Sequence, residues 1–251
     1  MCDVRLNANS SFQLMFVGNE NIPVLIIDDF VESPEKLIAS ASVLSEKDER
    51  FQSQQSDYYP GVRKSSPQSY QTVIGQSLFS LLKSSLFLPE KKVEKSSNYY
   101  TVSYLEVLMS AFSIATTKPE HLRPIQMLPH FDTPADNQLA MVHYLCDENH
   151  GGTSIYRHKE TGFERITEQR HSQYRQILKR QAIAEKLHIE PKYIEGDTVL
   201  FEQIFSVEAK MNRAIIYPSN VLHSGNIRTS TGLSAAPESG RLTISSFLLL
   251  K

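Results

Sequence analysis

The stretch Gly240-Arg241-Leu242-Thr243-Ile244-Ser245-Ser246-Phe247-Leu248-Leu249 alternates polar and apolar residues near the C-terminus. Side chains at positions i and i+2 of a β-strand point to the same face. Arg241 and Thr243 therefore share one face of the predicted strand, and Leu242 and Ile244 share the other. The stretch predicts a strand with one apolar face and one face that carries a cation beside a hydroxyl.

Further strand-like segments precede this one, and turns that contain Pro or Gly separate them. Such a succession of short strands indicates a core of β-structure. The chain is therefore predicted to be mainly β (α+β), with a sandwich or barrel at its centre. The predicted strands of this core span residues 99–109, 139–145, 198–205, 213–217 and 241–249.

The N-terminal part has a mixed pattern. An apolar run over residues 23–30 predicts a buried strand. Ser33-Pro34 is typical of a helix start, and the predicted helix reaches about residue 49. Apolar residues recur at helical spacing over 69–86, which predicts a second helix. The intervening residues 51–68 are rich in Ser, Gln, Tyr and Pro, and are predicted to form a loop.

Residues 167–187 interrupt the strands without any Gly or Pro, and they are dense in Gln, Arg, Lys and Ala. This composition predicts a charged surface helix inserted into the β core. We expect one domain over residues 1–251. In it, residues 1–98 supply the N-terminal strand and supporting helices, and residues 99–251 form the core with its helical insertion.

The composition argues against several classes of function. The 26 Lys and Arg residues nearly balance the 28 Asp and Glu residues, whereas a nucleic-acid-binding protein normally has a basic excess. No apolar run approaches the roughly 20 residues of a membrane helix. The first residues lack the pattern of a secretory signal. Cys2 and Cys146, the only cysteines, fit a reduced, cytoplasmic protein.

His130 and Asp132 stand two residues apart in a segment predicted to be extended. Their side chains would then point to the same side and could hold one metal ion. His223, just beyond the strand at 213–217, is the best candidate for a third ligand. Two histidines and one carboxylate form the facial triad of non-haem Fe(II) oxygenases. Alone, a His-x-Asp pair is a weak signal, and on that evidence a strand-end histidine bonded to a neighbouring Asp in a turn is the favoured interpretation.

Arg241 and Thr243 add a second signal. An Arg and a Thr on an otherwise apolar strand are costly to bury without a partner. A carboxylate co-substrate would satisfy both, because Arg binds a carboxylate with two parallel hydrogen bonds. The alternative is an exposed Arg, or a structural ion pair with an Asp or Glu of the protein.

The order of these motifs resembles the prolyl-hydroxylase-like branch of the 2-oxoglutarate/Fe(II)-dependent dioxygenases. The resemblance spans roughly residues 99–251, and the spacing from Asp132 to His223 and on to Arg241 fits. Further motifs of the branch stand in the expected order at Gly151-Gly152-Thr153, Gly196-Asp197-Thr198-Val199-Leu200-Phe201 and Asn212-Arg213. A narrower resemblance is to a bacterial subgroup of uncharacterised function, often found near tryptophan halogenases. It is carried by Phe112-Ser113, Tyr156-Arg157-His158 and Thr161-Gly162-Phe163-Glu164.

This resemblance implies a double-stranded β-helix, or jelly roll, with a metal at its open end. By analogy His130, Asp132 and His223 bind Fe(II), and Arg241 with Thr243 holds the far carboxylate of 2-oxoglutarate. The implied reaction is that of an oxidoreductase: O2 and 2-oxoglutarate are consumed, succinate and CO2 are released, and a substrate is hydroxylated. An iron halogenase of this fold would carry a small residue in place of Asp132, so a hydroxylase is expected.

The resemblance leaves three points open. The family's second contact to 2-oxoglutarate is often a Tyr on a preceding strand, and Tyr104 and Tyr144 both qualify. The substrate is a small molecule, an amino acid or a protein side chain. The insertion at 167–187 departs from the wider family and suggests a lid or an oligomer contact, such as that of a homodimer.

Two other functions compete with a dioxygenase. One is a non-catalytic jelly-roll protein that binds metal or acts as a scaffold. The other is a cupin-like metalloenzyme that does not use 2-oxoglutarate. Among the remaining histidines, His143 is predicted to be a satisfied core residue. His150 and His158 flank the Gly-Gly-Thr turn and are predicted to lie in solvated loops, with the mouth of a substrate site as the alternative. Three more are predicted to lie on the surface: His121, His171 and His188.

Overall fold

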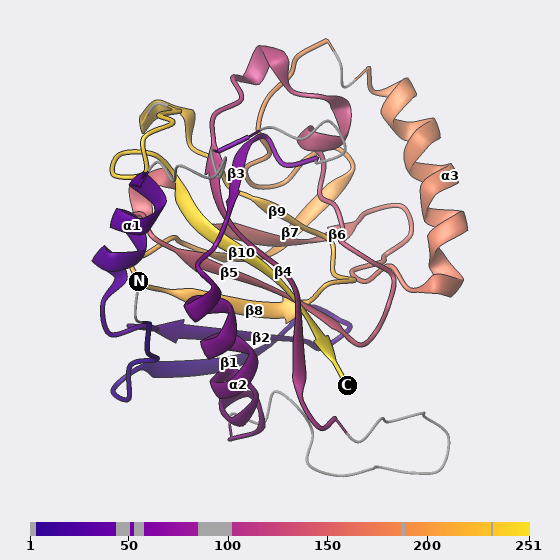
Figure 1. The fold of residues 1–251 in the computed structure, drawn as a ribbon. Coiled ribbons are helices and arrows are strands. Elements are labelled where there is room, and N and C mark those ends of the chain that lie inside the picture. Colours follow the sequence, from indigo (N-terminus) through magenta and orange to yellow (C-terminus); the bar gives the residue numbers. More distant parts are fainter. Residues whose placement is uncertain (1–3, 44–50, 53–57, 85–101, 187–188, 232) are drawn as a thin grey trace, which may run out of the picture.

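The structure is a computed structural model that describes residues 4–43, 51–52, 58–84, 102–186, 189–231 and 233–251 (Figure 1). Within these residues the chain is mainly β, with ten strands and three α-helices, as the sequence predicts. None of the described helices is both long and apolar enough to cross a lipid bilayer.

Seven strands form the larger sheet, in the order β1-β2-β8-β5-β10-β4-β3. Each neighbouring pair is antiparallel. The C-terminal strand β10 lies inside the sheet between β5 and β4, and strands from the N-terminal region form both edges. In sheet order the bounds are Ser11–Val17 (β1), Ile22–Asp28 (β2), Ala214–Pro218 (β8), Gln138–Tyr144 (β5), Leu242–Leu250 (β10), Leu105–Ala115 (β4) and Gly61–Ser65 (β3).

A smaller antiparallel sheet has the order β7-β6-β9. Its strands span Phe201–Val207 (β7), Thr153–His158 (β6) and His223–Gly225 (β9). It lies over one face of the larger sheet (Figure 1). An apolar cluster joins the two, with Ile155 of the smaller sheet and Ala140, Ile215 and Tyr217 of the larger one. The inner faces of the two sheets therefore enclose a common interior.

Helices cover the opposite face of the larger sheet. The helices α1 (Pro34–Ser42) and α2 (Gln68–Ser84) bury Leu37 and Ile74 against Phe112 of β4 and Ile244 of β10. All four side chains have no solvent exposure, and burying a side chain of this size stabilises a fold by about 1.5–3 kcal/mol. Ile244 thus packs against the helices, and Thr243 points towards the smaller sheet, as the alternation of this strand predicts.

The third helix, α3 (Glu168–Ala184), covers the outer face of the smaller sheet. Its buried residue Tyr174 packs in a cluster with Tyr156, Phe201 and Leu222. This helix is the insertion predicted at 167–187, whose final residue lies outside the described residues. In Figure 1 it lies at the side of the molecule, away from α1 and α2.

Three predicted strands agree with the structure to within one residue at each end. They are those at 139–145, 213–217 and 241–249, which are β5, β8 and β10. The strand predicted at 99–109 begins at Leu105 and continues to Ala115, and residues 99–101 lie outside the described ones. The strand predicted at 198–205 begins at Phe201. Three further strands, β1, β6 and β9, were not predicted.

The prediction of a loop over 51–68 is wrong at Gly61–Ser65, which form the edge strand β3. The segment lacks an apolar alternation, and pairing with β4 makes it a strand. Its Lys64 is buried and donates to the carbonyl oxygens of Ser40, Ala41 and Val43. A cation at the last carbonyls of a helix favours its end there. The described helix accordingly ends at Ser42 rather than near residue 49, and residues 44–49 lie outside the described ones.

Candidate metal centre

Backbone pairing brings the segment that carries His130 and Asp132 to the end of β9. His130 and His223 form an isolated β-bridge, with N···O distances of 2.9 and 2.8 Å. The N–H of Asp132 donates to the carbonyl oxygen of Ser219, just beyond β8, at 2.8 Å. Residues distant in sequence are therefore held side by side by main-chain hydrogen bonds.

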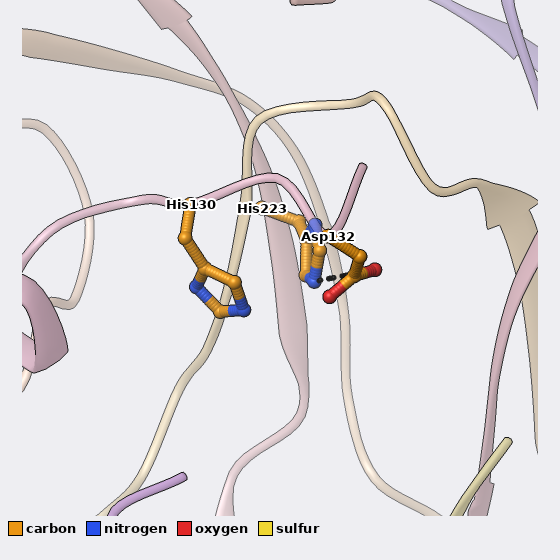
Figure 2. Close-up of side chains that lie close together, drawn as sticks. All are labelled: His130, Asp132 and His223. Atoms are coloured by element: carbon orange, nitrogen blue, oxygen red, sulfur yellow. Dashed lines mark ion pairs between the residues drawn. The ribbon is translucent and has the colours of Figure 1, made fainter. Parts of the chain in front are cut away.

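The side chains of His130, Asp132 and His223 converge (Figure 2). Each offers one ligand atom, and these atoms all lie within 4.8 Å of one another. The two imidazole rings have centroids 4.4 Å apart, and His223 Nε2 lies 3.8 Å from Asp132 Oδ2. Two imidazole nitrogens and a carboxylate oxygen around one point are a donor set for a divalent transition metal.

The hydrogen bonds of the triad fit a metal site. The Nδ1 of His223 lies 2.9 Å from the carbonyl oxygen of Val221. A carbonyl only accepts, so Nδ1 carries the proton, and Nε2 keeps its lone pair for a metal, as in most histidine ligands. Asp132 Oδ2 is buried and has no hydrogen-bond partner among the described residues. A buried carboxylate oxygen without a partner is costly, and a metal ion would satisfy it.

The electrostatics of the triad also favour a metal. The pKa of His130 is lowered well below its usual value, first by desolvation and then by the neighbouring His223 and Arg63. The residue as a whole is exposed to solvent, but His223 and Arg63 act in the same direction as desolvation. Its ring is therefore neutral at pH 7, the form that binds metals. Desolvation raises the pKa of Asp132, and the neighbouring His223 and Arg63 oppose that rise.

A row of polar side chains crosses the larger sheet beside this centre. Arg63 of β3 pairs with Ser113 of β4, which pairs with Thr243 of β10, which pairs with Tyr144 of β5. Residues that are paired in register share a face, so this row points into the interior between the sheets. Ser113, Thr243 and Tyr144 are fully buried or nearly so. An interior that served only for packing would be lined by apolar side chains rather than by such a row of polar ones.

Arg241 directly precedes β10, two residues before Thr243, and is buried. It donates through Nη2 to the carbonyl oxygen of Gly152 at 2.8 Å, and its Nε has no hydrogen-bond partner among the described residues. Its guanidinium carbon lies 5.9 Å from the centre of the Tyr144 ring. No carboxylate of the described residues forms an ion pair with it. A buried cation without an anionic partner is energetically costly, and an anionic ligand would compensate its charge.

The distance from Arg241 to the triad suits a small ligand. A Cβ on Gly225 would lie 3.5 Å from Arg241 Nη2. Gly225 and His223 stand two residues apart on β9 and share a face, which separates them by about 7 Å. Tyr217 lies near both His223 and Arg241. Its ring lies 4.9 Å from that of His223. Burial raises the pKa of Tyr217, Asp132 and Tyr144 add to the rise, and the charge of Arg241 opposes it.

Of the two tyrosines proposed as co-substrate contacts, the structure brings only Tyr144 to Arg241. Tyr144 is fully buried, and its hydroxyl lies 2.6 Å from that of Thr153. Tyr104 is 52% exposed, and its N–H donates to the carbonyl oxygen of Lys251, at the opposite end of β10. β4 runs antiparallel to β10, so the start of β4 at Leu105 lies beside the end of β10 at Leu250. Tyr104 therefore lies far from Arg241, which precedes β10.

Sequence reasoning missed two residues of this region, Tyr59 and Arg63. Both fall within the segment predicted to be a loop. Burial raises the pKa of Tyr59, and the charges of Arg241 and Arg63 oppose that rise, so Tyr59 lies near both guanidinium groups. The guanidinium of Arg63 lies 4.7 Å from the centre of the Tyr59 ring. Only the pairing of β3 with β4 brings them here, and no sequence motif marks them.

The other histidines have structural surroundings. His143 is a satisfied core residue, as predicted, with Tyr70 Oη 3.1 Å from Nδ1 and Asn212 Oδ1 3.1 Å from Nε2. The prediction for His158 is wrong, because this residue is buried on β6 and contacts Thr161 and Gln181. His150 lies in a turn, 2.8 Å from Asp147. His121 is exposed, His171 is half-buried against Phe131, and His188 lies outside the described residues.

The chain belongs to a family of unknown function, DUF6445, which it matches over residues 8–248. No curated protein matches the chain. The matched range contains the triad, Arg241 and Thr243, but the description of the family names no activity.

Proposed function

We propose that the protein is an Fe(II)- and 2-oxoglutarate-dependent dioxygenase that hydroxylates its substrate. The observation that carries the proposal is the convergence of His130, Asp132 and His223 within 4.8 Å, around a carboxylate oxygen that has no hydrogen-bond partner among the described residues. The two facing antiparallel sheets support a double-stranded β-helix as the fold. Arg241, buried beside the triad without a described carboxylate to pair with, supports an acidic co-substrate.

The triad would hold the metal through one nitrogen of each histidine and one oxygen of Asp132. Three protein ligands on one face leave positions for a chelating co-substrate and for O2. When bound, such a centre supplies oxidative decarboxylation of a 2-oxo acid coupled to hydroxylation of a C–H bond. Asp132 occupies the position at which a halogenating centre needs room for chloride, and this favours hydroxylation.

The polar row and Arg241 would bind the co-substrate. Arg241 donates two hydrogen bonds to the far carboxylate of 2-oxoglutarate, and Thr243 adds a third. The hydroxyl of Thr243 donates to the carbonyl oxygen of Ser113 over a long distance, 3.4 Å. A shorter hydrogen bond to a carboxylate would replace this interaction. Tyr144 packs beside the guanidinium, and Arg63 adds a second positive charge to the interior.

Other residues would orient the ligands and exclude water. The hydrogen bond from His223 Nδ1 to Val221 fixes the ring so that Nε2 faces Asp132. The ring of Tyr217 packs against His223 and closes the side of the centre towards the larger sheet. These contacts hold His223 in place before any metal binds, and such preorganisation increases affinity.

The test is anaerobic addition of Fe(II) and 2-oxoglutarate to the metal-free protein. We expect a visible metal-to-ligand charge-transfer band that is lost in His130→Ala and weakened in Arg241→Ala. Absence of the band in the wild-type protein, together with no binding of 2-oxoglutarate by calorimetry, would rule out the proposal. Metal binding without succinate release in the presence of any candidate substrate would instead indicate a non-catalytic metal-binding protein.

A further inference from the structure

Three arginines lie near the turn between β1 and β2, and one of them has no partner. Arg157 pairs with Glu164, at 2.5 Å between Nη2 and Oε1, and Arg170 pairs with Glu20 of the turn at 2.7 Å. No hydrogen bond or ion pair joins the guanidinium of Arg165 to any described residue, although its Nε is buried. A partly buried cation without a partner is costly. Arg165 therefore differs from its two neighbours, whose charges the fold itself compensates.

Two further buried polar atoms without a partner lie on the adjacent turn. Ser219 is fully buried and Asn220 is 1% exposed. Neither Oγ of Ser219 nor Oδ1 of Asn220 has a hydrogen-bond partner among the described residues. The amide nitrogen of Asn220 donates to Asp136 Oδ1 at 2.8 Å, which fixes this side chain. Because folded proteins satisfy nearly all buried polar atoms, unpartnered atoms on Arg165, Ser219 and Asn220 together indicate a bound molecule.

Backbone pairing places this cluster beside the triad. Arg165 and Val221 form an isolated β-bridge, so their side chains share a face. His223 stands two residues beyond Val221 and shares that face as well. Val221 is fully buried in the apolar cluster between the two sheets. On the other flank, the N–H of Asp132 donates to the carbonyl oxygen of Ser219 at 2.8 Å. Arg165 and two of the three metal ligands are therefore held by one short stretch of chain.

The charges of the cluster indicate the kind of molecule that fits. A guanidinium binds a carboxylate with two parallel hydrogen bonds. Asp136 is exposed at the same turn, and no described cation pairs with it. Its charge still reaches Arg165, because burial lowers the pKa of Arg165, and Glu20, Asp136 and Glu164 oppose that fall. A carboxylate beside a protonated amino group would satisfy Arg165, Asp136 and the Oδ1 of Asn220 at once.

We infer that this cluster binds the head group of the substrate, and that the substrate is a free α-amino acid. Its carboxylate lies on Arg165, and its ammonium group lies between Asp136 and the Oδ1 of Asn220. Its side chain then extends past Ser219 towards the triad. The inference rests on the proposed function for the chemistry at the triad, whereas binding of the head group requires no metal.

The test is binding of the common L-amino acids, one at a time, to the metal-free protein at pH 7, measured by ligand-observed NMR. We expect at least one of them to bind. Its C-terminal amide lacks the carboxylate and should bind about tenfold to a hundredfold more weakly, the range of hydrogen bonds to a charged group. Its N-acetyl form should bind only about twofold to fivefold more weakly, because Asp136 is exposed. Absence of binding by every amino acid, or equal affinity of the amide, would overturn the inference.

Variants locate the contact. Arg165→Gln should weaken binding of the amino acid by the same factor as the change to the amide, and should leave binding of the amide unchanged. Arg180→Gln is the matched control, because it removes the same charge on α3, where Arg180 pairs with Glu160. Asp136→Asn should cause only the smaller loss seen with the N-acetyl form, and its amide oxygen can still accept from Asn220. A loss in Arg180→Gln equal to that in Arg165→Gln would overturn the inference.

Thermal unfolding separates a ligand-binding arginine from a structural one. In the metal-free protein without ligand, Arg165→Gln should not lower the Tm, because it removes a cation that has no partner. Arg157→Gln should lower the Tm, because the carboxylate of Glu164 is fully buried and loses its cation. An equal fall of the Tm in the two variants would show that Arg165 is structural, and the inference would be wrong.

Mn(II) then tests whether the cluster serves the triad. We expect Mn(II) to broaden the side-chain signals of the bound amino acid in the wild-type protein and not in Asp132→Ala. Arg165→Gln should leave 2-oxoglutarate binding to the Mn(II)-loaded protein unchanged, which separates this cluster from Arg241. Amino-acid binding without broadening, in a protein that binds Mn(II), would overturn the assignment to the substrate. Absence of the Fe(II) charge-transfer band, with amino-acid binding that still depends on Arg165, would instead refute the proposed function and leave the head-group site standing.

Discussion

The two faces of the seven-stranded sheet bury their polar groups in different ways. On the face covered by α1 and α2, His143 lies in the apolar core, and both of its ring nitrogens have partners, Tyr70 and Asn212. On the side that meets the smaller sheet, buried atoms of Asp132 and Arg241 have no hydrogen-bond partner among the described residues. The first arrangement is complete without a ligand, and the second is not.

This difference separates structural from functional polar groups. Folded proteins satisfy nearly all buried polar atoms, so unpartnered ones that lie close together need an explanation. Here they belong to a carboxylate beside two histidines and to an arginine directly before β10 of the larger sheet. A metal ion and an acidic ligand would satisfy both. The contrast predicts that ligands change the stability of the protein through groups on the side that meets the smaller sheet. It also predicts that pH changes the stability through His143, on the face covered by helices.

The largest expected effect is that of a metal on stability. Mn(II) at 100 times its Kd should stabilise the wild-type protein by about 2.7 kcal/mol, because it binds only the folded triad. Asp132→Ala should abolish this shift. Differential scanning calorimetry with and without Mn(II) measures it. His143→Gln, on the other face, is the matched control and should keep the shift; a shift that persists in Asp132→Ala would contradict the metal site.

A smaller effect is expected from pH. Burial lowers the pKa of His143 from 6.5 to about 4, so the unfolded chain takes up this proton before the folded protein does. The contribution of His143 is therefore complete above pH 6.5 and is lost as the pH falls towards 4. Between pH 7.5 and pH 5 the loss is about 2 kcal/mol.

Urea unfolding of the metal-free protein at the two pH values measures this loss. Other groups titrate in the same range, so the informative quantity is the difference between the wild-type protein and His143→Gln. The variant should be less stable at pH 7.5 and should lose about 2 kcal/mol less on acidification. Equal pH dependence in the two proteins would show that His143 is not buried as a neutral ring.

The smallest effect concerns the two tyrosines proposed as co-substrate contacts. Tyr144→Phe removes the hydrogen bond to Thr153 that holds the ring beside Arg241, and should weaken 2-oxoglutarate binding to the Mn(II)-loaded protein by up to about 1 kcal/mol. Tyr104→Phe, at the opposite end of β10, should have no effect. Isothermal titration calorimetry compares the two variants. Equal losses would show that the position of Tyr144 beside Arg241 is irrelevant to binding.

Local patterns in the sequence predicted much of the fold and of the site. The alternation of β10 separates Thr243 from Leu242 and Ile244 correctly, because strand geometry fixes which side chains share a face. The same rule placed His130 beside Asp132. It could not detect β3, since Gly61–Ser65 have no apolar alternation and become a strand only by pairing with β4. Tyr59 and Arg63 were therefore missed as residues of the site.

By itself, the sequence determined the secondary structure of the regular strands and the types of residue available for metal and carboxylate binding. These depend on neighbours within a few positions along the chain. Only the tertiary structure decided that His223 meets His130, that Tyr144 rather than Tyr104 lies beside Arg241, and that no described carboxylate pairs with this arginine. Those facts depend on register between strands distant in sequence, and hydrogen bonds across the sheets set that register.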